Sequence, residues 1–422
     1  MKNIKRLSVF FYLLLLCQVY AVNLPYGIKK IRVPTGHLNQ YNSADHFNLN
    51  LIDENNLVYL PLSITSKNVN LPAALLFNTD NMSIRTLESP VNDLSTQLVG
   101  ITGKYWILES NVLNDYDLWV LDITTGTIAW KLRYEAVRQP FRGYKYKDQN
   151  INSFKGKSYF YNGKIYTLLV DEIICHSLKN GEREWSTPVG NPGYFTINGN
   201  GANLVVMTDT SLFSFNIARQ SKSWEISIPT IRLSGVIQPL KLLINTPEKI
   251  IVGYTVYAGP EKMESYLVSL QPGTGKVLWK LRFFGFYHMQ DYQVAGNILY
   301  LALGKQRKLF FINHTYTDVF AISMVNGKIL WKHVNLSGTV SELKYLPATH
   351  SLLALNLEKN QYSYRLNSQN GTTLSELPMN TLVKYQRNNF RQTAGKLTEQ
   401  GLVLVTPDAG DKQLFLDYLY WK

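Results

Sequence analysis

Cysteine is nearly absent from this chain, which has two cysteines in 422 residues, at positions 17 and 175. Cys17 lies in an apolar N-terminal run, so a chain that loses this run keeps Cys175 alone. A single thiol excludes an intramolecular disulfide and a zinc site built from several cysteines. Cys175 lies in the run EIICHSL, where a free thiol packs as a small hydrophobic group. We therefore expect Cys175 to be buried and unreactive.

Histidine and acidic residues do not cluster in the way that a catalytic metal requires. Seven histidines are scattered along the chain without the H-E-x-x-H spacing that places two imidazoles on one helical face for zinc. Asp115, Asp117 and Asp122 lie close together in sequence, but the further acids and the glycine of a calcium-binding loop are missing. We expect Asp115 and Asp117 to cap a loop. The sequence therefore predicts no metal site.

Motifs of nucleotide-dependent and nucleophilic enzymes are also missing. Gly156-Lys157-Ser158 looks like the end of a phosphate-binding loop, but Ile151 stands where that loop requires glycine, and no G-x-S-x-G elbow occurs. Cys175 precedes His176, and neighbours on a strand point to opposite faces, which argues against a nucleophile and base pair. The sequence predicts no catalytic residue, no cofactor and no enzymatic activity.

Long hydrophobic runs are confined to the N-terminus. After residue 21, no stretch approaches the roughly 18 uninterrupted apolar residues that a membrane-spanning helix needs. Residues 1–21 have the three parts of a secretory signal, which are a basic start, an apolar run and a small-residue end at Ala21. We expect cleavage there and an exported chain of residues 22–422, periplasmic or secreted. Leu16 precedes Cys17 where a lipoprotein signal has a small residue, so no lipid anchor is expected at Cys17.

The charge balance bears on the kind of partner. The formal net charge is +13 at pH 7, although only 17% of the residues are charged. A basic balance favours an anionic partner, such as an acidic protein face or a membrane head group. Export argues against nucleic acid. We therefore expect a protein partner in the envelope or secretory compartment, with peripheral membrane contact as an addition, and a monomer within a complex.

What the chain does contain is a repeat. The stretch LWVLDITTGTIAW, residues 118–130, combines an apolar strand, an Asp, a Thr-Gly turn and a Trp four residues after the Gly. Repeats of this size indicate stacked units or a closed ring. Glycine can adopt a positive φ at the turn without steric cost, and each Trp is expected to wedge between its own sheet and the next, where its indole N–H needs an acceptor. The repeat positions are Gly126, Trp130, Gly181, Trp185, Trp224, Gly275, Trp279, Gly327 and Trp331.

The repeat lapses at several places. Gln220 replaces the glycine that should precede Trp224. In a copy near the N-terminus, Met82 replaces the glycine, and in a late copy Ser375 stands where Trp belongs. Because loops and irregular positions carry what is individual to a protein, we expect its distinguishing features at these lapses and in the loops.

An apolar run of about six residues precedes each repeat turn, and there are eight such runs. Most are apolar on consecutive residues, which is typical of a strand covered on both faces. β-Branched and aromatic residues crowd these runs, and no 11-residue window shows a helical stripe. The sequence therefore predicts a nearly all-β chain. The runs begin at Asn56, Lys104, Lys164, Asn203, Ile250, Asn297, Ser351 and Gly401.

With eight such units and the motif L-D-x-x-T-G-x-x-x-W at residues 121–130, the chain resembles the pyrroloquinoline-quinone-like repeat family of β-propellers over residues 56 to 421. By size and export signal it is most similar to the propeller subunits of the bacterial outer-membrane barrel assembly machinery, which are scaffolds. The resemblance implies one all-β domain, residues 22–422, folded as an eight-bladed β-propeller of four-stranded blades. Seven blades are the fallback, and residues 22–55 are a candidate for closing the ring.

The same resemblance implies roles for the repeat residues. In the family, the Gly and Trp of each repeat dock one blade on the next and form no cofactor site. Other members are quinoprotein dehydrogenases, which hold the quinone and a calcium ion under a disulfide between adjacent cysteines. This chain has no such pair and is shorter, and a fold does not fix a function. A quinoprotein-type oxidoreductase, or a binder of small ligands or carbohydrate in the central channel, is the alternative function.

Two basic, aromatic segments are candidates for a contact surface, residues 134–146 and residues 384–396. Arginine among tyrosine and phenylalanine is the composition of interaction hot spots, although a solvated basic loop is the simpler interpretation of either one alone. We predict an exported, non-catalytic scaffold that mediates protein–protein interaction in cell-envelope assembly. Its candidate partner-binding residues are Arg138, Arg142, Lys145, Arg387 and Arg391.

Overall fold

The computed structural model confirms the all-β class. One single-turn 3-10 helix, Pro347–Thr349, is the only helical element within the described residues, and none of these residues forms an apolar helix of membrane-spanning length. The described residues are 26–32, 52–54, 56–62, 65–66, 69–70, 73–88, 96–112, 115–134, 158–169, 172–189, 196–207, 211–227, 242–257, 263–284, 288–309, 312–357, 361–378, 394–408 and 413–421.

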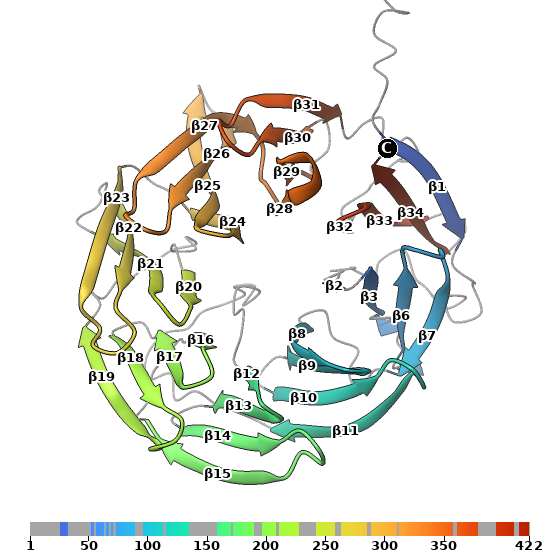
Figure 1. Cartoon of the computed structure of the whole chain (residues 1–422). Helices are drawn as coiled ribbons and strands as arrows, with labels where there is room; N and C mark the ends of the chain where they lie inside the picture. The colour runs from blue at the N-terminus through green and yellow to red at the C-terminus, as the bar shows by residue number, and fades with distance from the viewer. Residues whose placement is uncertain are drawn as a thin grey trace, which may run out of the picture.

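Eight four-stranded antiparallel sheets form a ring around a central opening (Figure 1). Each sheet is one blade, and its strands lie side by side from the centre to the rim. The predicted eight-bladed propeller of four-stranded blades is therefore confirmed, and the seven-bladed fallback is wrong.

In each of the first four blades, the strands follow one another in chain order from the inner to the outer edge. Blade 1 also carries a small ribbon of β4 (Thr65–Ser66) and β5 (Val69–Asn70). The strands are β2 (Ile52–Glu54), β3 (Leu57–Leu62), β6 (Ala73–Asn78) and β7 (Ile84–Glu88) in blade 1; β8 (Gln97–Thr102), β9 (Tyr105–Val112), β10 (Asp115–Asp122) and β11 (Thr127–Tyr134) in blade 2; β12 (Ser158–Tyr161), β13 (Lys164–Leu169), β14 (Glu172–Ser177) and β15 (Arg183–Pro188) in blade 3; and β16 (Thr196–Gly199), β17 (Asn203–Met207), β18 (Ser211–Asn216) and β19 (Ser221–Ser227) in blade 4.

The second half of the ring continues the same order, except that the last blade takes its outer strand from the N-terminus. The strands are β20 (Leu242–Asn245), β21 (Ile250–Tyr257), β22 (Met263–Leu270) and β23 (Val277–Phe284) in blade 5; β24 (His288–Ala295), β25 (Ile298–Leu309), β26 (Ile312–Ser323) and β27 (Ile329–Ser337) in blade 6; β28 (Glu342–Leu346), β29 (Ser351–Leu355), β30 (Tyr362–Asn367) and β31 (Thr373–Pro378) in blade 7; and β32 (Ala394–Leu397), β33 (Gly401–Asp408), β34 (Gln413–Trp421) and β1 (Tyr26–Arg32) in blade 8.

Blade 8 closes the ring through strand pairing between the two terminal parts of the chain. Strand β1 pairs with β34 in an antiparallel register that runs from Tyr26 opposite Trp421 to Arg32 opposite Phe415. The two ends of the chain therefore share one sheet (Figure 1). In blades 1 to 7, a turn joins the third strand to the fourth. In blade 8 the third strand is β34 and the fourth, β1, comes from the N-terminal part of the chain.

The hydrophobic core is divided into layers between neighbouring blades. The eight apolar runs of the sequence form the second strand of each blade, and β29, for example, is buried at all five residues. Each strand is covered by a blade on either side, as an unbroken apolar run predicts. The layer between blades 6 and 7 joins Tyr300 and Trp331 to Leu352 and Leu366. At about 1.5–3 kcal/mol for each fully buried large apolar side chain, these layers are the main source of stability.

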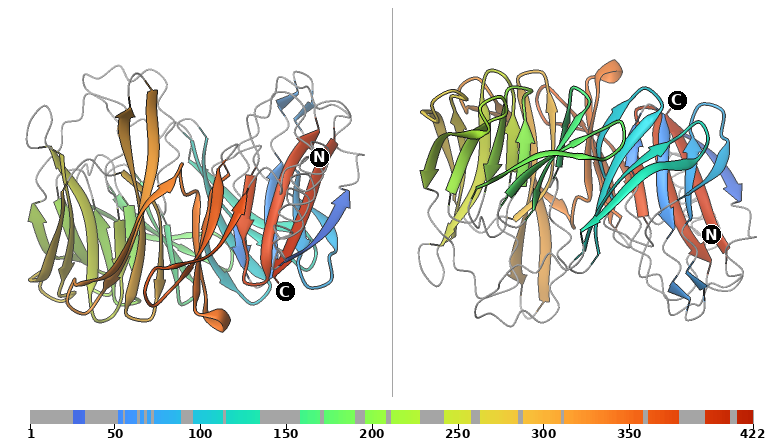
Figure 2. Two further views of the ribbon diagram at one scale, coloured as in Figure 1. Left: turned by 90° about the horizontal axis from the view of Figure 1, so that it is seen from above. Right: turned by 90° about the horizontal axis from the view of Figure 1, so that it is seen from below.

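One hairpin extends past the other strands of its own blade, blade 6. Strand β25 pairs with β24 only up to Gly304, and β26 pairs with β27 only from Tyr316 onward. Beyond those residues β25 and β26 pair with each other alone, up to Leu309 opposite Ile312. This two-stranded part projects from one face of the ring (Figure 2).

Candidate functional site

The repeat tryptophans of blades 2 to 6 pack against the following blade. They lie on the outer strands, and four of them donate their indole N–H across the seam to a backbone carbonyl of the following blade. The distances are 2.7 Å from Trp130 to Leu178, 2.7 Å from Trp224 to Pro272, 3.1 Å from Trp279 to Met324 and 2.9 Å from Trp331 to Ser368. The acceptor that a buried indole needs is therefore a fixed position of the next repeat turn.

The glycine under each ring belongs to the next repeat. A Cβ added at Gly371 would lie 2.5 Å from Cε3 of Trp331, and one at Gly327 would lie 2.6 Å from Cε3 of Trp279. Gly181 meets Trp130, and Gly275 meets Trp224, in the same way. These glycines have φ between +70° and +75°, so they combine a left-handed turn with the absence of a side chain. The sequence grouped Gly126 with Trp130, whereas the contact crosses the seam to Gly181.

The irregular turns keep the left-handed backbone conformation but lack the pair of glycine and tryptophan. Gln220 and Met82 stand in the glycine position, and their φ values are +50° and +59°. Trp185 stacks on Phe215 of blade 4, with ring centroids 6.2 Å apart. At Gly126, an added Cβ would lie 3.2 Å from a methyl group of Leu87. The left-handed turn is therefore kept in these blades, and the packing on it varies.

The aspartates of blade 2 have structural partners. Asp122 accepts the backbone N–H of Thr124 at 2.9 Å and lies 2.6 Å from Nζ of Lys104, which is the largest cause of its lowered pKa. Asp117 accepts two hydrogen bonds of 2.8 Å from Arg133. The expectation that Asp117 caps a loop is wrong, because β10 begins at Asp115 and Asp117 pairs within the strand.

Acidic residues of the inner strands form a second type of seam contact. Asp291 of β24 accepts the N–H of Leu343 at 2.7 Å, and Glu342 of β28 accepts the N–H of Leu397 at 2.9 Å. Lys396 lies 2.8 Å from the other Glu342 oxygen, but burial raises the pKa of this carboxyl. The two acids are about one repeat apart, and this spacing was the signal in the sequence that could have identified them.

Cys175 and His176 are neighbours on β14 and lie on its opposite faces, Cys175 toward blade 4 and His176 toward blade 2. Cys175 is fully buried, and burial raises its thiol pKa to about 11, so the thiolate is scarce at neutral pH. His176 is also buried, with Nε2 2.5 Å from the Tyr134 hydroxyl and Nδ1 without a hydrogen-bond partner. Within the part of the chain that the structure describes, no three His, Cys, Asp or Glu side chains converge in a metal-binding group.

The buried imidazole predicts an acid-sensitive fold. Burial and the charge of Arg183 lower the pKa of His176 to about 4, below its ordinary 6.5. Between pH 6.5 and pH 4 the imidazole is therefore protonated in the unfolded chain but neutral in the folded chain. The contribution of the neutral His176 to stability is fully present above pH 6.5 and is lost as the pH falls toward 4. We expect wild type to lose about 2–3 kcal/mol more than His176→Gln between pH 7 and pH 4.5. The measurement is the melting temperature of both proteins at a series of pH values. An equal fall with pH for the two proteins would contradict this assignment.

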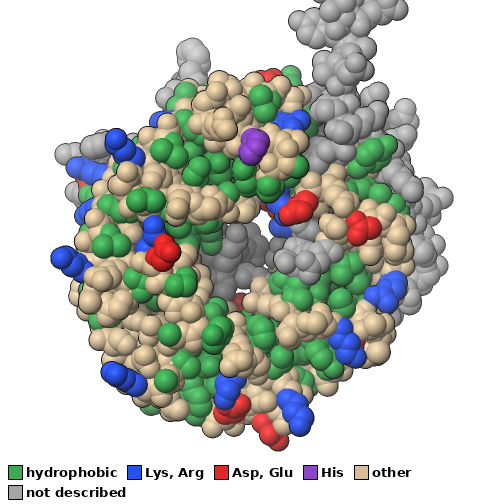
Figure 3. Space-filling view, in the orientation of Figure 1, with side chains coloured by type: hydrophobic (Ala, Val, Ile, Leu, Met, Phe, Trp, Pro, Cys, Tyr) green, Lys and Arg blue, Asp and Glu red, His purple; other side chains and the backbone are tan. Residues whose placement is uncertain are grey.

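The predicted partner-binding residues lie outside the described residues. This holds for Arg138, Arg142, Lys145, Arg387 and Arg391, so their role stays a prediction. On the face shown in Figure 3, the described basic side chains are spread around the ring and interspersed with acidic ones.

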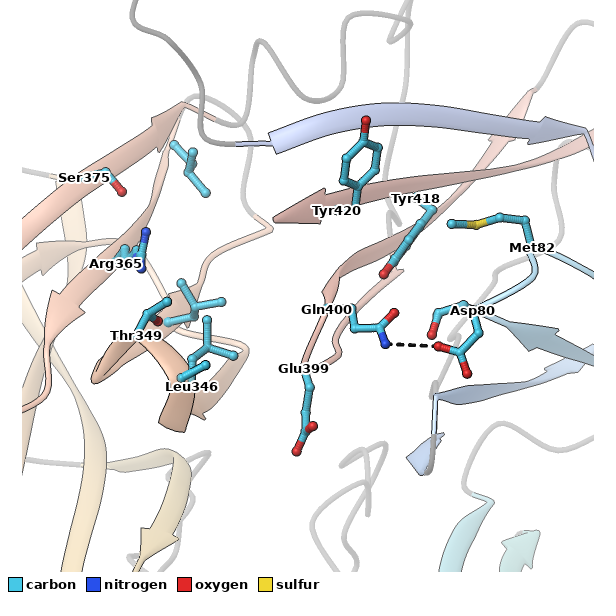
Figure 4. Close-up of a pocket in the computed structure, with 14 residues that line it drawn as sticks. Asp80, Met82, Leu346, Thr349, Arg365, Ser375, Glu399, Gln400, Tyr418 and Tyr420 are labelled. Carbon is cyan, nitrogen blue, oxygen red and sulfur yellow. Dashed lines mark hydrogen bonds between the residues drawn. The ribbon is translucent and has the colours of Figure 1, made fainter. Parts of the chain in front are cut away.

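A cavity of about 460 Å³ lies where blades 7, 8 and 1 meet (Figure 4). Its lining combines apolar side chains, such as Met82 and Leu377, with the polar groups of Arg365, Glu399 and Gln400. Gln400 of blade 8 donates a 3.0 Å hydrogen bond to Asp80 of blade 1. Neither seam of blade 8 has the pair of glycine and tryptophan, because Ser375 stands in the tryptophan position of blade 7 and Met82 in the glycine position of blade 1.

The repeat motif and the ring agree with a known family. Residues 115–374 match the family described as outer membrane protein assembly factor BamB. The chain belongs to this family. The resemblance inferred from the repeat motif is confirmed, and the match begins at β10 and ends within β31, so it takes in the blades that carry the tryptophan fasteners. No curated protein sequence matches the chain.

Solved structures share the fold at low sequence identity. The computationally designed Ika8 protein has a TM-score of 0.54 and 12% identity, over 88% of this chain and 95% of that chain. Quinohemoprotein alcohol dehydrogenase ADHIIG from Pseudomonas putida HK5 has a TM-score of 0.51 and 9% identity, over 93% and 76%. BamB from Moraxella catarrhalis has a TM-score of 0.48 and 11% identity, over 93% and 98%. The likeness to the designed protein and to the dehydrogenase shows the fold alone.

Proposed function

We propose that this protein is an exported, non-catalytic scaffold that binds other proteins during assembly of the cell envelope. The observation that carries the proposal is membership of a family described as an outer membrane protein assembly factor, over residues 115–374. The secretory-type N-terminus, residues 1–21, supports export.

The geometry of the seams supports a binding role over a chemical one. The tryptophans, glycines and acids that the repeat supplies are engaged in blade–blade contacts, as at Trp331, Gly371 and Asp291. A ring fastened in this way is a rigid support for its connecting loops, and loops on a rigid frame commonly carry binding residues. We therefore assign partner binding to the loops, with the basic segments 134–146 and 384–396 as the first candidates.

The partner-binding assignment predicts a charge-specific loss of recovery. We expect Arg138→Glu, Arg142→Glu and Lys145→Glu, combined in one full-length protein, to reduce co-purification of envelope proteins at least about tenfold, because rim charges govern encounter with an acidic face. Arg387→Glu with Arg391→Glu is the second test protein. The matched control replaces three exposed basic residues from other parts of the chain with Glu. They are Lys131, Lys179 and Arg219. Equal recovery with the test and control proteins would remove these residues from the interface.

The alternative of a quinone-dependent oxidoreductase is tested on the same purified protein. Adding pyrroloquinoline quinone and calcium should produce no dye-linked alcohol oxidation if the protein is a scaffold. The described residues do not supply the group of acidic ligands that calcium would need, and the chain has no adjacent cysteines. Clear turnover would overturn the scaffold proposal.

A further inference from the structure

Ser375 occupies a strand position that holds a tryptophan in five other blades. In blade 6, Trp331 lies opposite Ala321 of the neighbouring strand, and in blade 7 Ser375 lies opposite Arg365 in the same register. The corresponding positions in the other Trp-bearing blades show the same pairing with a residue smaller than arginine. The cavity at the junction of blades 7, 8 and 1 is lined by Ser375 itself. It therefore lies where an indole ring packs at the regular seams.

Two polar side chains that line this cavity, Ser375 and Arg365, have hydrogen-bonding groups without a partner among the described residues. The Ser375 hydroxyl oxygen is buried without a hydrogen-bond partner. Within the described residues, Arg365 makes one hydrogen bond, from Nε to the Ser351 hydroxyl at 3.1 Å, and no ion pair. A buried hydroxyl without a partner is costly, and a planar guanidinium is a good stacking surface for an aromatic ring. These groups favour an occupant that is flat, apolar and able to form a hydrogen bond.

The walls of the cavity fit such an occupant. Figure 4 shows Arg365 and Ser375 on the blade 7 side, facing Tyr418 and Tyr420 of β34 across the space. Met82 of blade 1 closes a further side, and its thioether makes favourable contacts with aromatic rings. Tyrosine and methionine walls with a few polar groups are typical of sites that accept an aromatic side chain.

We propose that this cavity binds an aromatic side chain, of the size of tryptophan, presented by a segment of a partner protein. The partner's ring takes the place of the tryptophan that Ser375 replaces, stacks on Arg365 and forms the seam contact that the chain itself lacks. The inference deepens the proposed scaffold function and rests on it for the partner being a protein.

The test uses N-acetyl-tryptophanamide as the probe, with N-acetyl-leucinamide as the aliphatic control, in saturation-transfer NMR on the full-length protein. We expect the tryptophan probe to bind and the leucine probe to bind at least about tenfold more weakly. Ser375→Trp fills the site from within and should abolish probe binding. Thr86→Trp is the control, because Thr86 follows the turn residue Met82 by four positions, as Ser375 follows Gly371, but does not line the cavity. It should leave probe binding unchanged.

A second variant guards against misfolding of Ser375→Trp. Arg365→Met keeps the length of the side chain and removes the cation, and we expect about threefold weaker probe binding from the loss of stacking. No binding of the tryptophan probe to wild type, or equal binding to wild type and a folded Ser375→Trp protein, would overturn the proposal. Unchanged binding to Arg365→Met would remove Arg365 from the site and with it the stacking arrangement that we propose.

Recovery of envelope proteins separates this inference from the scaffold function. We expect Ser375→Trp to lower recovery of a partner that the Thr86→Trp protein still retains. If partners are recovered equally with both, the cavity is not their binding site, although the scaffold function stands. If wild type recovers no partner at all, the scaffold function itself fails.

Discussion

Replacing Trp331 by alanine should destabilise the ring by about 3–5 kcal/mol, the range for a large buried aromatic side chain. Trp331 is 8% exposed, lies in the layer between blades 6 and 7 and donates its indole N–H to Ser368 at 2.9 Å. The substitution opens a cavity at the seam and leaves a carbonyl of blade 7 with one partner fewer. Urea unfolding followed by circular dichroism measures the loss.

The neighbouring residue supplies the control for this change. Leu330 is on the same strand but is 50% exposed, so Leu330→Ala removes apolar atoms that are mostly in contact with water. We expect it to change stability by less than about 1 kcal/mol. Similar losses for the two substitutions would mean that the tryptophan is not a fastener between the blades.

The second large effect is expected at Gly371, where two costs coincide. Alanine there must adopt φ of +74°, and its Cβ would lie 2.5 Å from Cε3 of Trp331. A left-handed residue costs about 1–2 kcal/mol, and the displaced ring adds to it, so we expect a total of about 3 kcal/mol or more for Gly371→Ala. Thermal unfolding of the variant beside wild type measures it.

Gly103 allows the two costs to be separated. It has φ of +56°, but an added Cβ would meet no atom within 4 Å. Gly103→Ala should therefore show the backbone cost alone, about 1–2 kcal/mol. In a Trp331→Ala background, the cost of Gly371→Ala in stability should fall to the same value. The difference is a coupling energy of about 1–2 kcal/mol between the two residues. Additive losses in the double variant would show that the ring and the turn do not depend on each other.

Local patterns in the sequence were sufficient for the fold because each part of a blade is determined by neighbours along the chain. The unbroken apolar runs predicted strands buried on both faces, and these runs became the second strand of every blade. Gly181 and Gly275 predicted left-handed turns and have positive φ. A period that recurs along the chain specifies one unit many times, so a few clear copies identify the whole ring.

What the sequence by itself determined is the repeating unit: apolar runs, turn glycines and tryptophans that need a buried acceptor. Only the tertiary structure decided which units meet. It paired Trp331 with Gly371 of the following blade and placed the N-terminal strand beside β34. It also brought the lapses at Met82 and Ser375, far apart in sequence, to one cavity. The physical reason is that strand and turn propensities act over a few residues, whereas a seam depends on how the ring closes.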